Sequence, residues 1–184
     1  MEIIFETERL TLKILDKQFS KSVLDFYSRN KNFLKEWEPS RLEGFYTLGF
    51  QENLLDDKFL AFTNGSLVEF WIFKKDCTNK IIGSVIFNII IGGNFLNCHI
   101  AYNMDESETN KGYITEAARK GIDIIFNQYK LHRIEANIMP KNKASLRVAE
   151  KLGFHKEGLA SKYLQINDKW EDHIRMALLN DEMQ

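Results

Sequence analysis

Strands are predicted along much of this chain, because apolar and polar residues alternate in several short runs. In residues 8–14, the apolar Leu10, Leu12 and Ile14 are separated by polar residues, as in a strand with one buried face. Similar runs predict further strands over residues 68–74, 81–91, 95–104, 133–139, 154–166 and 169–179. Turn residues separate the later strands: Asp76, Thr78 and Asn79; Gly92-Gly93-Asn94; and Asn167-Asp168.

Four helices are predicted where apolar residues recur every three or four positions. The clearest pattern covers residues 113–129, and a second helix is expected over 48–62. Asp16 can cap a helix over 17–29, whereas Asn142 can cap one over 143–152 that Gly153 closes. The aromatic segment 33–47 is expected to be irregular. Because no repeat or linker interrupts these elements, they favour one α+β domain over residues 1–184.

The composition is that of an ordinary globular protein. The 184 residues are 44% hydrophobic and 28% charged, which excludes a disordered chain. With 25 basic and 26 acidic residues the formal net charge is −1, which argues against a broad electrostatic nucleic-acid binder. Cys77, Cys98 and the four scattered histidines lack metal-ligand spacing. Without a secretory signal or an apolar run long enough for a membrane, we expect a cytoplasmic protein that binds no metal.

A strand, a polar loop and a helix start follow one another between Met104 and Arg119. A helix start leaves backbone N–H groups without partners at the positive end of the helix dipole, which favours phosphate binding. Gly112 lets the backbone approach a ligand closely, because it has no side chain. Taken alone, the pattern better fits a glycine that only permits a tight turn, since a single glycine before a helix is common.

A second motif joins Asn142 to Ser145 at the start of the helix predicted over 143–152. Asn142 is a suitable N-cap, and Ser145 can simply occupy the first helical turn. However, Ser145 shares a helical face with Val148, Ala149 and Leu152. A hydroxyl on that inward stripe needs a hydrogen-bond partner or a function.

Several short motifs follow one another from one end of the chain to the other. In chain order they are Glu6-Thr7-Glu8-Arg9-Leu10-Thr11-Leu12, Ile82-Gly83, Lys111-Gly112-Tyr113-Ile114-Thr115-Glu116-Ala117, His132-Arg133-Ile134-Glu135-Ala136, Asn142-Lys143-Ala144-Ser145 with Glu150-Lys151-Leu152-Gly153-Phe154, and Trp170-Glu171-Asp172-His173. This series resembles the GNAT superfamily of acetyl-CoA-dependent N-acetyltransferases. More narrowly, it is similar to the branch that acetylates the N-termini of ribosomal proteins.

The resemblance implies a central mixed, mostly antiparallel sheet of about seven strands flanked by about four helices. It implies acetyl-CoA as cosubstrate, an amine acceptor such as a ribosomal-protein N-terminus, and a monomer or homodimer without nucleic acid or membrane. The residues implied to bind acetyl-CoA are Met104, Asp105, Asn110, Lys111, Gly112, Tyr113, Ile114, Thr115, Asn137, Asn142, Ser145 and Lys151.

The resemblance also assigns roles in the reaction. Backbone N–H groups near Asn103, Met104 and Asp105 would polarise the thioester carbonyl. Ser145 would donate a proton to the leaving thiolate, and Asn142 would contact the pantetheine arm. Trp37 and Tyr163 would wall the acceptor pocket.

The chain departs from the family pattern at two places. In the phosphate loop, Ser107 and Asn110 replace the usual residues, although Asn tolerates the left-handed backbone that a glycine would adopt. The loop also carries the carboxylates of Asp105, Glu106 and Glu108. Nearby cations are expected to offset their charge: Lys111, Lys141, Lys143, Arg147 and Lys151.

The second departure concerns the general base. The branch has a glutamate about nineteen residues beyond the serine, yet residues 161–165 contain no carboxylate. A water chain or a carboxylate elsewhere must then take the proton, and the candidates are Glu36, Glu38, Glu106 and Glu135. Three functions stay open: acetylation of a protein N-terminus, acetylation of a small amine such as a polyamine, amino acid or antibiotic, and non-catalytic CoA binding.

Overall fold

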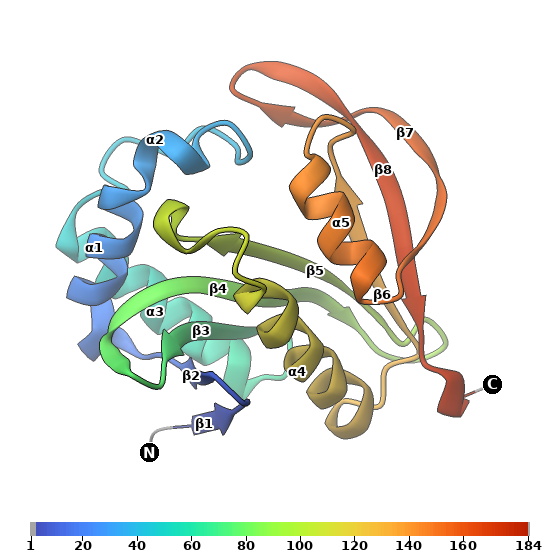
Figure 1. The fold of residues 1–184 in the computed structure, drawn as a ribbon, viewed down its shortest axis with the longest axis horizontal. Helices are drawn as coiled ribbons and strands as arrows, with labels where there is room; N and C mark the ends of the chain where they lie inside the picture. The colour runs from blue at the N-terminus through green and yellow to red at the C-terminus, as the bar shows by residue number, and fades with distance from the viewer. Residues whose placement is uncertain (1–2, 184) are drawn as a thin grey trace.

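Eight strands form one sheet in the order β1-β2-β3-β4-β5-β6-β8-β7 in this computed structural model, which describes residues 3–183 (Figure 1). The strands are β1 (Ile3–Glu6), β2 (Leu10–Ile14), β3 (Val68–Lys74), β4 (Cys77–Ile91), β5 (Asn97–Met104), β6 (Arg133–Ile138), β7 (His155–Ile166) and β8 (Lys169–Leu179). All neighbouring strands are antiparallel except β5 and β6, which are parallel. The expected mixed, mostly antiparallel α+β architecture is therefore confirmed.

Five helices accompany the sheet: α1 (Ser20–Arg29), α2 (Lys31–Leu34), α3 (Leu48–Thr63), α4 (Tyr113–Gln128) and α5 (Lys143–Lys151). Short 3₁₀ turns cover Lys17–Phe19, Glu106–Glu108 and Asp181–Met183. Successive residues of β3 point to opposite faces. Trp71 and Phe73 pack with α1 and α3, whereas Phe70 and Ile72 pack with α4 and α5. The sheet thus lies between two helical layers.

The predicted caps are present. The Asp16 side chain accepts a hydrogen bond from Gln18 N, and Asn142 Oδ1 accepts one from Ser145 N at 3.0 Å. The hairpin turn at Asn167 and Asp168 has both residues in the left-handed region, with φ of 48° and 63°. The two caps and the turn were correctly predicted from the sequence, because each depends only on neighbouring residues.

Three elements differ from the sequence prediction. The four-residue β1 was missed, because so short a run carries little alternation. β4 begins at Cys77 rather than at residue 81, since Lys74 pairs directly with Cys77 and the turn is at residues 75–76. The short helix α2 extends into the segment expected to be irregular.

The parallel pair β5–β6 is short, and this shortness shapes the site. The two strands pair only from Asn97 with Arg133 to His99 with Glu135. Beyond those residues β5 continues to Met104 and β6 to Ile138, and the strands run apart (Figure 1). Beyond these pairs the facing edges of β5 and β6 are not hydrogen-bonded to each other, and we call the gap between them the β5–β6 opening.

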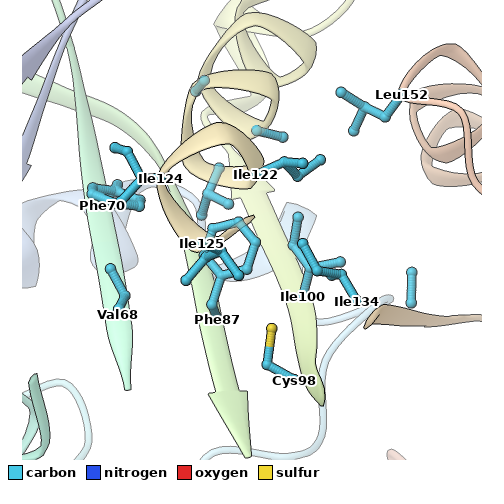
Figure 2. Close-up of a cluster of buried hydrophobic side chains, with 14 of the residues drawn as sticks. Val68, Phe70, Phe87, Cys98, Ile100, Ile122, Ile124, Ile125, Ile134 and Leu152 are labelled. Carbon is cyan, nitrogen blue, oxygen red and sulfur yellow. The ribbon is translucent and has the colours of Figure 1, made fainter. Parts of the chain in front are cut away.

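Helix α4 crosses the sheet beside this opening and contacts it closely. Figure 2 shows its Ile122 and Ile125 above Phe87 of β4 and Ile100 of β5. A Cβ atom added at Gly121 would lie 2.6 Å from Phe87 Cε2, which is closer than packed carbons approach. The absence of a side chain at this position lets the helix reach the sheet.

Gly121→Ala is expected to lower the free energy of unfolding by about 1–3 kcal/mol, because the new methyl group overpacks against the Phe87 ring. This should occur even though alanine favours helix by about 1 kcal/mol over glycine. Gly49→Ala in α3 is the matched control, since nothing lies within 4 Å of its added Cβ atom. Urea unfolding should show the control unchanged or more stable, and a stable Gly121→Ala variant would contradict the packing argument.

Candidate active site

The opening between β5 and β6 presents different residues on its two faces. Along β5, Tyr102 and Met104 lie on the face covered by α4 and α5, whereas His99 and Asn103 lie on the opposite face, where Asn103 contacts Glu38 after α2. Along β6, Ala136 and Ile138 face α5, and Asn137 lies on the other side with His99. Two molecules could therefore approach the same opening from opposite faces of the sheet.

The loop before α4 has the backbone that an anion site requires. Asn110 has φ 61° and Gly112 has φ 81°, so both adopt the left-handed conformation. The first intrahelical bond runs from Glu116 N to Gly112 O. The N–H groups of Tyr113, Ile114 and Thr115 therefore lie outside the helical ladder, and no side chain caps them. Asn110 adopts the backbone conformation expected where the family has glycine.

Asp105, which directly follows β5, is held by neighbouring residues of the protein. Its backbone N–H donates to Ile82 O at 2.7 Å. Its buried carboxylate is held by Arg29 at 2.8 Å and Lys80 at 3.2 Å, and it accepts hydrogen bonds from Ser107. Burial alone would raise the pKa of Asp105, but these hydrogen bonds outweigh it and hold that pKa well below the ordinary value of 3.8. The Asp105 side chain therefore organises the loop, and its place among the acetyl-CoA-binding residues stays a prediction.

The other loop carboxylates also have partners or solvent. Glu108 is buried between Lys111, at 2.9 Å, and Lys74, at 3.5 Å. Hydrogen bonding to Lys111 lowers the pKa of Glu108. Lys111 is therefore committed to the loop itself, and Lys141 is similarly paired with Glu171 at 3.0 Å. The cations left exposed on this side are Lys143, Arg147 and Lys151.

Glu116 ties the start of α4 to the start of β2. Its Oε1 accepts from Thr7 Oγ1 at 2.6 Å and from Arg9 N at 2.9 Å, and its Oε2 accepts from Arg9 Nε at 2.7 Å. Arg9 also donates to Lys111 O and lies 4.7 Å from the Tyr113 ring centroid. These contacts join two of the motifs found in the sequence into one structural unit.

An open cleft of about 690 Å³ lies beside this unit. Gly112 and Thr115 from the start of α4 line it, together with Arg119, Lys120 and Lys151. Its lining also includes the carboxylates of Glu6, Glu8, Glu116 and Asp123, so the side-chain charge of the cleft is mixed. The part of the cleft that suits a phosphorylated ligand is the start of α4, where backbone N–H groups lie outside the helical ladder.

Ser145 has the partner that its inward position requires. Its Oγ donates to the Tyr102 phenol oxygen at 3.0 Å, and the Tyr102 OH donates to the Ser145 backbone oxygen at 3.0 Å. Burial raises the pKa of Tyr102 to about 12, although the Ser145 hydrogen bond lowers it somewhat. Tyr102 is therefore a neutral hydroxyl beside Ser145. Sequence reasoning missed it, because its alternation with Ile100 and Met104 only indicates a core residue.

Asn137 and Tyr163 meet on the opposite face of the opening. Asn137 Nδ2 donates to the Tyr163 OH at 3.3 Å and lies 3.5 Å from His99 Nδ1. Asn137 Oδ1 is buried without a hydrogen-bond partner within residues 3–183, so it can accept from a ligand donor. Tyr163 also packs on His173, with ring centroids 5.4 Å apart.

The four candidate bases have different surroundings. Glu36 is exposed, and its carboxylate has no partner in the part of the chain that the structure describes. Glu106 is exposed on the phosphate loop. Burial acts to raise the pKa of Glu135, but hydrogen bonds from Arg133 and Arg175 lower it more. Glu38 alone of the four contacts the free end of β5, through Asn103 at 3.4 Å.

A second cleft, of about 440 Å³, lies beside Glu38. Tyr27, Arg41 and Tyr46 line it from the α1–α3 region, and Asn167 lines it from the β7–β8 turn. Trp37 and Tyr163, which were expected to wall an acceptor pocket, lie outside this lining. Their acceptor role stays a prediction.

Comparison with known proteins identifies the family. The model of the acetyltransferase (GNAT) domain matches residues 9–155. The chain belongs to the GNAT acetyltransferase family. It is 38% identical over 159 residues to the probable N-acetyltransferase YjcK of Bacillus subtilis, covering 86% of this chain and 87% of that protein. It is 36% identical over 174 residues to the [ribosomal protein uS5]-alanine N-acetyltransferase of Escherichia coli, covering 94% and 88%.

A solved structure agrees with this assignment. The ribosomal-protein-S5-alanine acetyltransferase of Vibrio fischeri is 32% identical and superposes with a TM-score of 0.94 over 99% of both chains. The protein is thus an N-acetyltransferase of the GNAT family, whose cosubstrate is acetyl-CoA, as the sequence resemblance implied. Within residues 3–183, no cluster of metal-ligating side chains occurs and no helix is long and apolar enough to span a membrane.

Asp105→Asn is expected to lower the free energy of unfolding at neutral pH by about 1–3 kcal/mol, because Arg29 and Lys80 lose their shared carboxylate. The folded-state pKa of Asp105 is depressed, so its stabilisation is present above the ordinary value of 3.8 and is lost as pH falls below it. Urea unfolding at several pH values should therefore show wild type and variant converging in acid. A difference that persists unchanged in acid would contradict the role given to this carboxylate.

Proposed function

We propose that this GNAT acetyltransferase, as one domain over residues 1–184, transfers the acetyl group of acetyl-CoA to a protein N-terminal amine, such as that of a ribosomal protein. The observation that supports the acetyl-transfer part is the pair Tyr102–Ser145, which lies across the β5–β6 opening beside the start of α4. The acceptor class is supported by the relatives of similar length that are named ribosomal-protein alanine acetyltransferases. Cytoplasmic location stays a prediction.

The cofactor side of the opening fits acetyl-CoA. The free N–H groups of Tyr113, Ile114 and Thr115 would hold the pyrophosphate, since the loop carboxylates Asp105 and Glu108 are already paired within the protein. Lys151 in the adjoining cleft adds positive charge. At the start of α5, Asn142 Oδ1 caps the helix and Ser145 Oγ contacts Tyr102 of β5. We expect the pantetheine arm to pass beside these two residues.

The residues at the opening supply the proton that the leaving group needs. Ser145 Oγ donates its proton to the departing thiolate, and Tyr102 is hydrogen-bonded to that same oxygen. In the structure the Tyr102 O–H donates to the Ser145 backbone oxygen. Because Tyr102 remains protonated, its hydroxyl could turn to donate to Ser145 Oγ once that oxygen has given up its proton, and so stabilise the charge that develops there. The backbone N–H of Met104 would polarise the carbonyl, because alternation along β5 turns it away from β4. The N–H groups of Asn103 and Asp105 lie on the β4 side, where that of Asp105 donates to Ile82 O.

Thermal-shift titration tests the cosubstrate site. Acetyl-CoA and CoA are expected to stabilise the protein by about 2.7 kcal/mol at one hundred times the dissociation constant, whereas NADH should not. Gly112→Glu should remove the shift, because a side chain at this left-handed position blocks the free N–H groups and adds negative charge. A Gly112→Glu variant that folds and still binds acetyl-CoA would place the phosphate site elsewhere.

The acceptor class is tested by mass spectrometry after incubation with acetyl-CoA. We expect a peptide with N-terminal alanine to be acetylated at its α-amine faster than spermidine or a free amino acid. Faster acetylation of a small amine would assign the small-molecule function instead. Tight acetyl-CoA binding without transfer to any amine would assign a non-catalytic role.

Ser145→Ala is expected to lower kcat by about 10²-fold while the dissociation constant of acetyl-CoA changes by less than about threefold. The reason is that the hydroxyl acts mainly on the leaving group, in the transition state. Steady-state kinetics and the thermal shift measure the two quantities separately. Unchanged kcat would remove Ser145 from the mechanism.

A further inference from the structure

We propose that Glu38 receives the acceptor: its carboxylate binds the incoming ammonium group and removes its proton. This inference rests on the proposed function and names the base for it. The sequence leaves that role open, because the strand after α5 lacks the glutamate of the family branch.

Glu38 contacts the strand where the reaction would occur. Its Oε1 accepts a hydrogen bond from Asn103 Nδ2 at 3.4 Å, and Asn103 directly follows Tyr102, the partner of Ser145. Because neighbouring residues of a strand point to opposite faces, Glu38 lies across the sheet opening from Ser145. A base on one face and a proton donor on the other match what acyl transfer to an amine requires.

The backbone around Glu38 is held from two directions. Its N–H donates to Leu34 O at 3.2 Å, which ties it to the end of α2. From the far side, Asn167 in the β7–β8 turn donates to Lys35 O at 2.6 Å and accepts from Ser40 Oγ at 3.3 Å. Lys35, before Glu38, and Ser40, after it, are therefore both held by Asn167. These contacts fix the position of the backbone that carries the Glu38 carboxylate.

The cleft of about 440 Å³ gives an acceptor access to this carboxylate. Glu38 forms part of its lining, and its side chain is 22% exposed. The other Glu38 oxygen, Oε2, is paired with Arg41, which itself lies over the Tyr27 and Phe45 rings. Lys31, Lys35 and Tyr46 are the other titratable groups at this cleft, with Glu43. Oε1 accepts only a long hydrogen bond, 3.4 Å from Asn103 Nδ2, and a carboxylate oxygen can accept a second one. Oε1 is therefore the oxygen that we expect to accept a hydrogen bond from an amine.

The transfer balances in protons and bonds. Glu38 takes one proton from the ammonium group, and the neutral nitrogen forms a bond to the acetyl carbon. The carbon–sulfur bond breaks, and the thiolate takes one proton from Ser145 Oγ. The nitrogen loses its second proton as the amide forms, and that proton replaces the one Ser145 gave. The proton on Glu38 then passes to water.

The test compares wild type with Glu38→Gln, using a peptide with N-terminal alanine as the acceptor probe. An α-amine has a pKa of about 7.7–8.0, so only about one in twenty is neutral near pH 6.5, and nearly all are neutral near pH 9. Glu38→Gln is expected to lower kcat/KM by about 100-fold near pH 6.5. The defect should shrink about tenfold near pH 9, because the substrate no longer needs the base.

Two controls separate a chemical role from a structural one. Glu36→Gln removes an exposed carboxylate two residues away and should leave kcat/KM unchanged at both pH values. Glu38→Asp keeps a carboxylate and should recover part of the activity near pH 6.5. The acetyl-CoA thermal shift should be the same in all variants, which shows that each is folded.

Three results would contradict the role proposed for Glu38. A Glu38→Gln defect of equal size at both pH values would overturn the proposal, since it would show that Glu38 only shapes the acceptor side. Wild-type rates in Glu38→Gln would overturn it directly. If wild type binds acetyl-CoA but acetylates no amine, the proposed function fails, and this inference fails with it.

Discussion

The short parallel pairing between β5 and β6 determines where everything else in this protein lies. A parallel pair requires a crossover, and here the crossover is α4 with the loop before it. The crossover begins at the free end of β5, so the start of α4 and the unpaired part of β5 lie near each other. Had the strands paired over their whole length, the opening that Ser145 and Glu38 face would be closed by backbone hydrogen bonds.

Side chains that alternate along β5 place different residues on the two faces of the opening. Tyr102 and Asn103 are neighbours on β5, yet one contacts Ser145 and the other contacts Glu38. A single stretch of backbone thus separates the proposed proton donor, Ser145, from the proposed base, Glu38. The loop carboxylates are kept out of this arrangement, because Asp105 and Glu108 are paired with cations of the protein itself.

Local features of the fold and site could be predicted from the sequence, whereas contacts between distant segments could not. The caps at Asp16 and Asn142 and the turn at Asn167-Asp168 depend on adjacent residues and were found. The left-handed Asn110 was anticipated from the family resemblance, because the family usually has glycine at this position. The Glu38–Asn103 contact joins residues 65 positions apart, and no periodicity within either segment indicates it.

The tie between Glu116 and Thr7 and Arg9 has a consequence for how ligand binding and folding depend on each other. The start of the chain and the start of α4 share these hydrogen bonds, so the N–H groups that face an anion are correctly placed only when the first strands are docked. By thermodynamic linkage, a ligand at the start of α4 must also favour the docked state of the chain's opening residues. Undocking of the N-terminal segment and ligand affinity at the start of α4 therefore depend on the same docking equilibrium.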